Sequence, residues 1–358
     1  MLINIQFLRF VAAMMVVFHH SAEHLRSGGH GLGLLFGFGQ SAGFAGVDIF
    51  FVISGFIMAW TTENAAGGKD ALLFAKRRAA RIYSGYWPFY LLAVGLFYML
   101  SRHYLANVHF LSSALLWPTE LRYLLIPVSW TLVFEMGFYL MFAILVASTS
   151  VRRASIIRLL TVAVLGWSLF SHFVSHAYDP GQLETMSVYE QYLAFPFLLE
   201  FLLGSILANW LKMHPEGFSW TLLLAGISLL VAGGWINNIH FNGNLIQGYF
   251  IIWRVLIFGS AAVLIVAGMV RLENLGWACA TRFSLLAGGA SYAIYLSHTL
   301  ILDAARRLGL NTLIAQNPAW VAQAALICLS ALIVLYSMTH YRWLERPLHY
   351  AFRRWLKA

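Results

Sequence analysis

Residues 7–24 read FLRFVAAMMVVFHHSAEH, an apolar run that contains Arg9, two adjacent histidines and a short polar end. A helix that crosses a membrane needs about 20 mostly apolar residues. Lipid offers the backbone no hydrogen bonds, so only helices and closed barrels can span it. Because the apolar positions run on without alternating, this stretch predicts a membrane-spanning helix and not a barrel strand.

The composition of the whole chain agrees with this stretch. Of the 358 residues, 60% are hydrophobic and 10% are charged, whereas soluble chains carry about 25% charged residues. This composition excludes a soluble enzyme, a disordered regulator and a nucleic-acid-binding domain, so we expect no nucleic acid as a partner. We predict an all-α, polytopic membrane helix bundle that forms one domain over residues 1–358.

About ten segments are long and apolar enough to span. We place them at 4–25, 44–61, 80–101, 125–147, 155–175, 190–211, 218–236, 249–270, 283–303 and 319–343. The stretch 108–118 is too short to span, and we expect it to be interfacial or re-entrant.

The basic residues predict the orientation, because Lys and Arg gather in cytoplasmic loops. With both termini inside, 16 of the 23 Lys and Arg residues lie in inner loops or the tail, and five lie in outer loops. We therefore predict an N-in, C-in topology. The basic surplus would also contact anionic lipid headgroups.

Two ionisable residues of the first helix lie on one face. Arg9 and His20 are 11 residues apart, which is about three turns and about 16 Å along a helix. Such residues inside a membrane are costly and mark candidate functional sites. A cation near one end and a base near the other could hold a long anionic substrate. The alternative is an arginine that reaches the membrane surface and an interfacial histidine.

The second helix carries a carboxylate, Asp48, which we expect at a depth similar to that of His20. Residues 43–60 read GFAGVDIFFVISGFIMAW. A carboxylate beside an imidazole fixes its tautomer and raises its basicity, so we expect Asp48 to contact His20. The alternative is an Asp that caps a glycine-rich helix, where Gly46 and Gly55 allow close packing.

Basic residues also gather at the inner end of the third helix. Arg78 and Arg81 are three positions apart and therefore share a face. Arginine binds phosphate oxygens in a forked geometry, so the pair predicts a phosphate site. The alternative is an ordinary cluster of cytoplasmic charges.

Further charges lie in or near the later spans. Glu135 lies well inside an apolar helix, one turn before Tyr139, and a buried carboxylate predicts an Arg or His partner. Arg254 is a buried cation to which the sequence assigns no partner. For His298 and Glu345 we expect packing and an ion pair at a helix end more than catalysis.

Several of these residues belong to longer motifs. In chain order the motifs are Arg9 with His20, GVDIFFVISGF at 46–56, FAKRRAARIYSGYW at 74–87, WTLVFEMGFY at 130–139, SYAIYLSH at 291–298 and ERP at 345–347. In this order and spacing they resemble the membrane acyltransferase-3 family, which acylates cell-surface and extracellular carbohydrates. Ser84 stands where the family usually has proline, and Met136 replaces a second acidic residue. The WTLxxEM variant is most similar to the exopolysaccharide-acetylating branch.

The resemblance implies transfer of an acyl group, usually acetyl, from acyl-CoA to a sugar hydroxyl by a protein of the bacterial inner membrane. His20, oriented by Asp48, would be the general base, and a transient acyl-histidine is an alternative. We assign catalysis to His20, Asp48 and Glu135, donor binding to Arg9, Arg78 and Arg81, and substrate contacts to Trp130, Tyr139 and His298. We expect no metal and no permanently bound cofactor. The partners are acyl-CoA, a carbohydrate acceptor and membrane lipids.

A transporter of a polysaccharide precursor or a small anion is the alternative from another class, because intramembrane charges also mark transport paths. The chain shows no internal inverted repeat and no paired broken helices, which weakens this alternative. Consumption of acyl-CoA with release of free thiol would distinguish the two.

Overall fold

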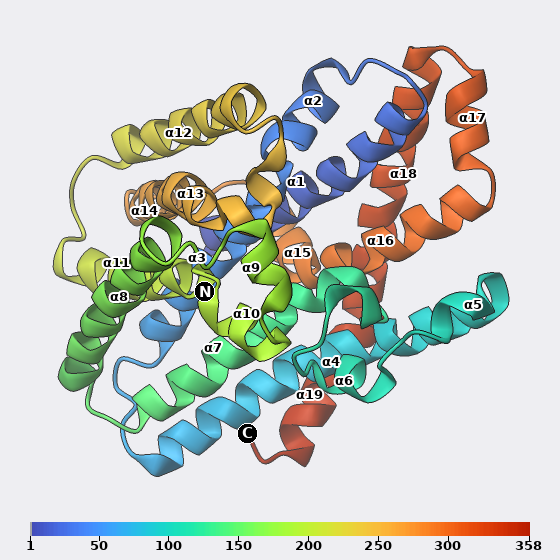
Figure 1. The fold of residues 1–358 in the computed structure, drawn as a ribbon. Coiled ribbons are helices and arrows are strands. Elements are labelled where there is room, and N and C mark those ends of the chain that lie inside the picture. Colours follow the sequence, from blue (N-terminus) through green and yellow to red (C-terminus); the bar gives the residue numbers. More distant parts are fainter. Residues whose placement is uncertain (1) are drawn as a thin grey trace.

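The computed structural model describes residues 2–358, apart from the side chains at positions 180, 183, 184, 193, 194 and 249. Figure 1 shows a bundle of helices, and no strand occurs in the described residues. This confirms the predicted all-α class. The helices are α1 (Ile3–Ser27), α2 (Gly33–Ala42), α3 (Gly46–Thr61), α4 (Gly68–Leu100), α5 (Arg102–Leu105), α6 (Phe110–Leu115), α7 (Trp130–Val146), α8 (Ser150–Phe173), α9 (Pro180–Thr185), α10 (Val188–Ala194), α11 (Phe197–Met213), α12 (Ser219–His240), α13 (Ile251–Arg254), α14 (Ser260–Asn274), α15 (Thr281–Gly289), α16 (Ser291–Arg307), α17 (Leu310–Gln316), α18 (Ala319–His340) and α19 (Arg346–Trp355).

The number of spanning helices is slightly below the predicted ten. Within residues 2–358, eight segments are long and apolar enough to cross a membrane, or nine if α15 and α16, bent by 55°, form one span. The remaining predicted span, 80–101, lies in α4. That helix has 33 residues, but its spanning part contains Ser, Gly, Tyr and Pro residues that lower its hydropathy. A polytopic membrane bundle is nevertheless what the helices form.

Glycines let α3 pack closely against its neighbours, as the sequence predicted. A Cβ at Gly55 would overlap the carbonyl oxygen of Phe201 in α11, and a Cβ at Gly46 would overlap the carbonyl oxygen of Ala12 in α1. Backbones can approach this closely only where one side chain is missing. These close contacts place α3 between α1 and α11. The candidate functional site lies in this part of the bundle.

The stretch 108–118 folds back along α4. Its short helix α6 offers backbone carbonyls to aromatic side chains of α4: Tyr86 donates to Ser113, Trp87 to Ala114 and Tyr90 to Phe110. Because carbonyls at a helix end have no intrahelical partner, these donors allow a short helix to lie beside a spanning one. Both alternatives for this stretch, interfacial and re-entrant, stay predictions.

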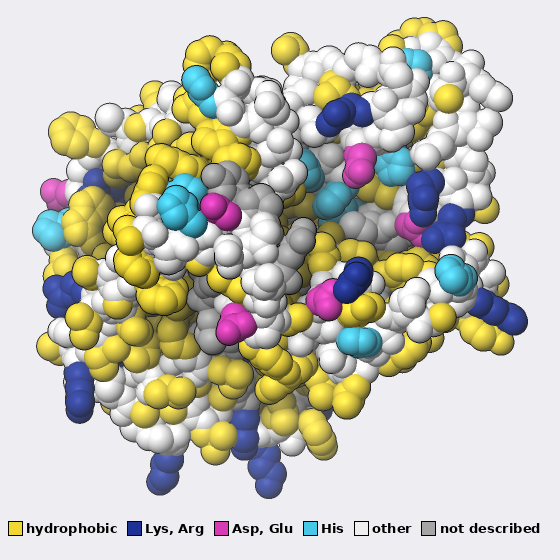
Figure 2. All heavy atoms as spheres, in the orientation of Figure 1, with side chains coloured by type: hydrophobic (Ala, Val, Ile, Leu, Met, Phe, Trp, Pro, Cys, Tyr) yellow, Lys and Arg dark blue, Asp and Glu magenta, His cyan; other side chains and the backbone are white. Residues whose placement is uncertain are grey.

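Basic side chains protrude along the lower edge of the molecule in Figure 2, near the start of α4 and the end of the chain. In the predicted orientation this edge faces the cytoplasm. The N-in, C-in topology itself stays a prediction.

Candidate functional site

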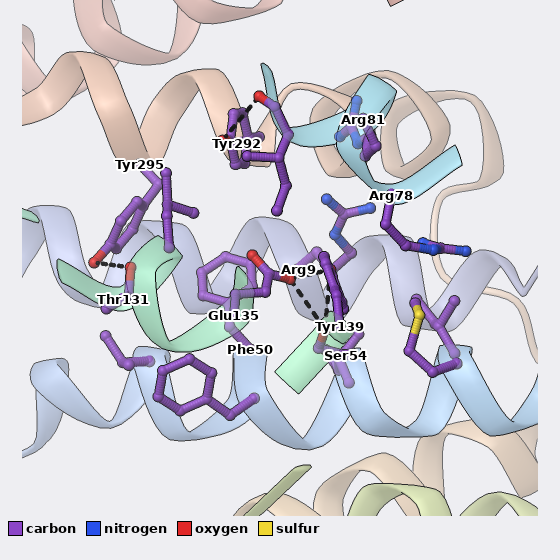
Figure 3. Close-up of a pocket in the computed structure, with 17 residues that line it drawn as sticks. Arg9, Phe50, Ser54, Arg78, Arg81, Thr131, Glu135, Tyr139, Tyr292 and Tyr295 are labelled. Carbon is purple, nitrogen blue, oxygen red and sulfur yellow. Dashed lines mark hydrogen bonds between the residues drawn. The ribbon is translucent and has the colours of Figure 1, made fainter. Parts of the chain in front are cut away.

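One pocket, which we call the arginine pocket, lies between α1, α3, α4, α7 and α16. Its polar lining comes from Arg9, Ser54, Arg78, Arg81, Thr131, Glu135, Tyr139, Tyr292 and Tyr295. Figure 3 shows an elongated arrangement, with the arginines towards one end, Tyr295 and Thr131 at the other, and Glu135 between them. The structure thus brings together all three predicted donor-binding residues with Glu135 and Tyr139.

The three arginines differ in their partners. Arg81 forms an ion pair of 2.6 Å with the fully buried Glu345, which confirms the predicted ion pair at the last helix end. Among the described residues, Arg9 and Arg78 form no such ion pair. The Arg78 guanidinium instead lies 5.4 Å from the ring centre of Phe74 and 5.8 Å from that of Tyr139. Two cations are therefore left for an anionic ligand.

Glu135 has hydroxyl partners in place of the predicted Arg or His. Its carboxylate accepts a hydrogen bond from Ser54, at 3.0 Å, and another from Tyr139. Arg9 and Arg78 line the same pocket and are attracted to this carboxylate, but neither is hydrogen-bonded to it among the described residues, so the predicted arginine is a neighbour and not a hydrogen-bond partner. The physical reason is the geometry of the pocket, where α3 and α7 bring two hydroxyls within reach, and charge-assisted hydrogen bonds satisfy a carboxylate.

A second pocket, the aromatic pocket, opens at the other end of α1. It includes His19, His20, Trp130, Phe134, Tyr192, Phe197 and Arg254. Val47 and Tyr295 line both pockets. The Tyr295 hydroxyl donates to the carbonyl of Val128 and accepts from Thr131, each at 3.0 Å. The two pockets therefore adjoin at Val47 and Tyr295.

His20 lies between two other imidazoles. Its ring centre is 5.2 Å from that of His19 and 5.2 Å from that of His298. Nδ1 of His19 bonds the carbonyl of Gly39, and Nδ1 of His298 bonds that of Ile294. No hydrogen bond to another described side chain or carbonyl fixes His20, so its ring nitrogens are available to a ligand. His298 is fully buried behind it.

The predicted contact between Asp48 and His20 does not form. Arg254 takes the carboxylate of Asp48, with its Nη2 2.7 Å from Oδ2 and its Nε 3.1 Å from Oδ1. The two side chains are 0% and 2% exposed. A buried guanidinium requires a buried carboxylate close by, and the sequence analysis left Arg254 without one. Asp48 is thus a partner of Arg254.

The acyltransferase-3 family model, described as an acyltransferase domain, matches residues 2–340. The chain belongs to the acyltransferase-3 family. This match covers nearly the whole chain, which confirms the resemblance that the motifs carried. The family membership makes acyl transfer the reaction of this membrane protein, in preference to the transporter alternative.

One relative of this acyltransferase is similar over most of both chains. It is the exopolysaccharide production protein ExoZ of Rhizobium meliloti (strain 1021), 31% identical over 324 residues, which are 86% of this chain and 89% of ExoZ. No solved structure matches the chain.

The sequence analysis of this acyltransferase missed Glu200. Its side chain is fully buried on α11, and neither carboxylate oxygen has a hydrogen-bond partner among the described residues. It lies close enough to Asp48 to interact with it, and both face Arg254. The sequence did contain a sign of it. Residues 197–205 read FLLEFLLGS and place the Glu200 carboxylate in an apolar helix, and an ionisable residue inside a membrane helix is a candidate functional residue.

Among the described residues of the acyltransferase, no group of three or more His, Cys, Asp or Glu side chains is arranged to hold a metal ion. Of the nine predicted site residues, Arg9, Arg78, Arg81, Glu135 and Tyr139 line the arginine pocket, and His20 and Trp130 line the aromatic pocket. His298 packs against His20, and Asp48 pairs with Arg254.

Proposed function

We propose that the protein transfers an acyl group, most simply acetyl, from acyl-CoA to a hydroxyl group of an exopolysaccharide or its lipid-linked precursor. The observation that carries the proposal is the placement of Arg9 and His20 on one uninterrupted helix. Arg9 lines the arginine pocket and His20 lines the aromatic pocket, about 16 Å apart along the axis.

The arginine pocket is the proposed site for the phosphates of the donor. Arg9 and Arg78 have no carboxylate partner among the described residues, and burial strengthens charge-assisted hydrogen bonds to phosphate oxygens. In the predicted orientation this pocket lies nearer the cytoplasm, where acyl-CoA is found. The Arg81 charge is already neutralised by Glu345, so Arg81 acts mainly by holding α4 against the last helix.

The long thin arm of the donor would pass from the arginine pocket to His20. Its path passes Val47 and Tyr295, which line both pockets. The Tyr295 hydroxyl is held by Val128 and Thr131, so the ring has a fixed place beside this path. The thioester then lies next to the imidazole.

The chemical step needs only a base and a polar environment for the developing charge. His20 takes the proton of the acceptor hydroxyl while its oxygen attacks the thioester carbonyl carbon. A new C–O bond forms, the C–S bond breaks, and the proton passes to the leaving thiolate, giving free CoA thiol and an ester. Because no hydrogen bond to a described residue occupies His20, its nitrogen is free for the hydroxyl.

The acceptor class is supported by the relative whose name records exopolysaccharide production. The aromatic pocket presents the ring faces of Trp130, Phe134 and Tyr192, which suit the apolar parts of the two substrates, namely the donor arm or the lipid carrier of the glycan. We place the protein in the bacterial inner membrane, where cytoplasmic donor and exported glycan can reach opposite ends of α1.

The test uses the purified full chain with acetyl-CoA and de-O-acylated exopolysaccharide from the producing strain. We expect acceptor-dependent release of free thiol and a new ester on the glycan. His20→Ala abolishes both, whereas His103→Ala, an exposed histidine on α5, leaves them unchanged. Thiol release and ester formation at the wild-type rate in His20→Ala would contradict the role of His20. No thiol release from the wild-type protein would contradict the proposed function.

A further inference from the structure

A third pocket, which we call the polar pocket, lies outside the two already described. It is lined from α1 by His20, Glu23, His24 and Ser27, from α16 by Thr299, Asp303 and Arg306, and from α17 by Asn311. In Figure 2, histidine, acidic and basic side chains gather around a hollow over the ends of α1 and α16. This surface contrasts with the apolar side chains that cover much of the rest of that view.

His20 joins the polar pocket to the aromatic pocket, because it lines both. A reagent in the aromatic pocket and a second reagent in the polar pocket would therefore meet at the same imidazole. The two pockets differ in chemistry, since the aromatic one presents mainly ring faces and the polar one presents carboxylates, an amide and hydroxyls. Two reagents of different polarity fit this arrangement.

The lining of the polar pocket has no surplus of positive charge for a phosphorylated ligand, because Arg306 lies there together with Glu23 and Asp303. Asp303 is held by Arg306 at 2.5 Å and by Arg307 at 2.7 Å. Glu23 forms no ion pair among the described residues and is exposed. Its free carboxylate repels phosphates, whereas it accepts hydrogen bonds from neutral hydroxyls.

Polar atoms beside His20 also lack partners. Oγ1 of Thr299, a residue that lines the polar pocket, is buried without a hydrogen bond to any described residue. Nε2 of His298, whose ring packs against His20, is in the same state. Buried polar atoms are normally satisfied, so the Thr299 hydroxyl points to a hydroxylated ligand at the inner end of the pocket, whereas His298 lines none of the three pockets.

We propose that the polar pocket binds the acceptor as an uncharged, polyhydroxylated stretch of carbohydrate and presents one hydroxyl to His20. Glu23 and Asn311 hold neighbouring sugar hydroxyls, and the donor thioester reaches the same imidazole from the aromatic pocket. This inference rests on the proposed function and adds the place of the acceptor. Acylation then proceeds by the step already given, in which the hydroxyl proton leaves to His20 and the CoA thiolate takes up a proton.

The test separates acceptor binding from donor binding in the full-length protein. Glu23→Ala removes the free carboxylate, and Ser27→Trp fills the pocket from an exposed position without removing a charge. With acetyl-CoA and the de-O-acylated exopolysaccharide, we expect each variant to raise the KM for the glycan about tenfold. The KM for acetyl-CoA stays at the wild-type value.

Asp179→Ala is the matched control, because this acidic residue of another predicted outer loop lines none of the three pockets described. An unchanged glycan KM in both Glu23→Ala and Ser27→Trp would overturn the inference while leaving the proposed function intact. An equal rise in the KM for acetyl-CoA would also overturn it, because the pocket would then serve the donor. Absence of transfer in the wild-type protein would instead refute the proposed function itself.

Discussion

Two groups of buried charges lie in the same bundle, and they differ in where their partners come from. Around Arg254, the chain supplies the carboxylate of Asp48 directly, and both side chains are sealed from solvent. In the arginine pocket, only Arg81 has such a partner. Arg9 and Arg78 face the cavity without one among the described residues.

The two groups differ in role. The Asp48–Arg254 pair stabilises the bundle, whereas Arg9 and Arg78 are proposed to bind a ligand. Removing one partner of a buried ion pair leaves the other charge uncompensated and is strongly destabilising. Arg9 and Arg78 form no ion pair among the described residues and are attracted to Glu135 across the pocket, so removing one of them should cost less stability than breaking the Asp48–Arg254 pair, while ligand binding is lost. The two groups therefore predict opposite mutational signatures.

The largest expected effect is on folding, in Asp48→Ala. Arg254 would keep only Glu200 beside it, whose oxygens make no hydrogen bond among the described residues, so we expect a loss of up to about 3–5 kcal/mol and little folded protein in the membrane. The measurement is the amount of protein in membranes and its thermal stability in detergent. The double variant Asp48→Ala with Arg254→Met should recover part of the loss. Normal levels of the single variant would show that the pair does not hold the bundle.

The next effect is on donor binding, in Arg78→Ala. Loss of a charge-assisted hydrogen bond to phosphate costs about 1.5–3 kcal/mol, so the KM for acetyl-CoA should rise about 10- to 100-fold. Protein levels should stay normal. The control is Arg77→Ala. Arg77 is the neighbour of Arg78 on α4, but it is exposed and lies outside the arginine pocket. Equal effects of the two substitutions would indicate general attraction by surface charge.

The smallest effect concerns Ser54, whose hydroxyl donates to Glu135. Ser54→Ala removes one of two hydrogen bonds to that carboxylate and keeps Tyr139, so we expect a loss of about 1 kcal/mol, or about fivefold in kcat/KM. Steady-state kinetics on both substrates would measure it. A loss as large as that of Glu135→Ala would mean that Ser54 itself contacts the substrate.

Much of the fold follows from the sequence, because apolar length and motif order are local properties. The position of α1, with Arg9 and His20 on one uninterrupted helix, needed only the helical repeat. The close packing at Gly55 followed from the absence of a side chain. The span predicted at 80–101 is not among the helices apolar enough to cross a membrane, because α4 mixes apolar residues with polar ones.

Partner choice was less predictable, because it depends on which helices become neighbours. Nothing in the local sequence of Asp48 distinguishes His20 from Arg254 as its partner, and Arg254 lies 206 positions away. Ser54 reaches Glu135 from another helix, α3, in the same way, whereas Tyr139 lies one turn away on α7 itself, a spacing that the sequence shows. The polar pocket could not be predicted for a related reason. Its residues come from the ends of three helices, and the sequence does not show that these ends lie together.

Arg9 and Arg78 are proposed to bind the phosphates of the donor, and this is the central claim. The most direct measurement is calorimetric binding of CoA to the purified wild-type protein, to Arg9→Ala with Arg78→Ala, and to His20→Ala. We predict that the double variant is folded and binds CoA at least 100-fold more weakly, while His20→Ala binds it like the wild type. Wild-type affinity in the double variant would contradict the account.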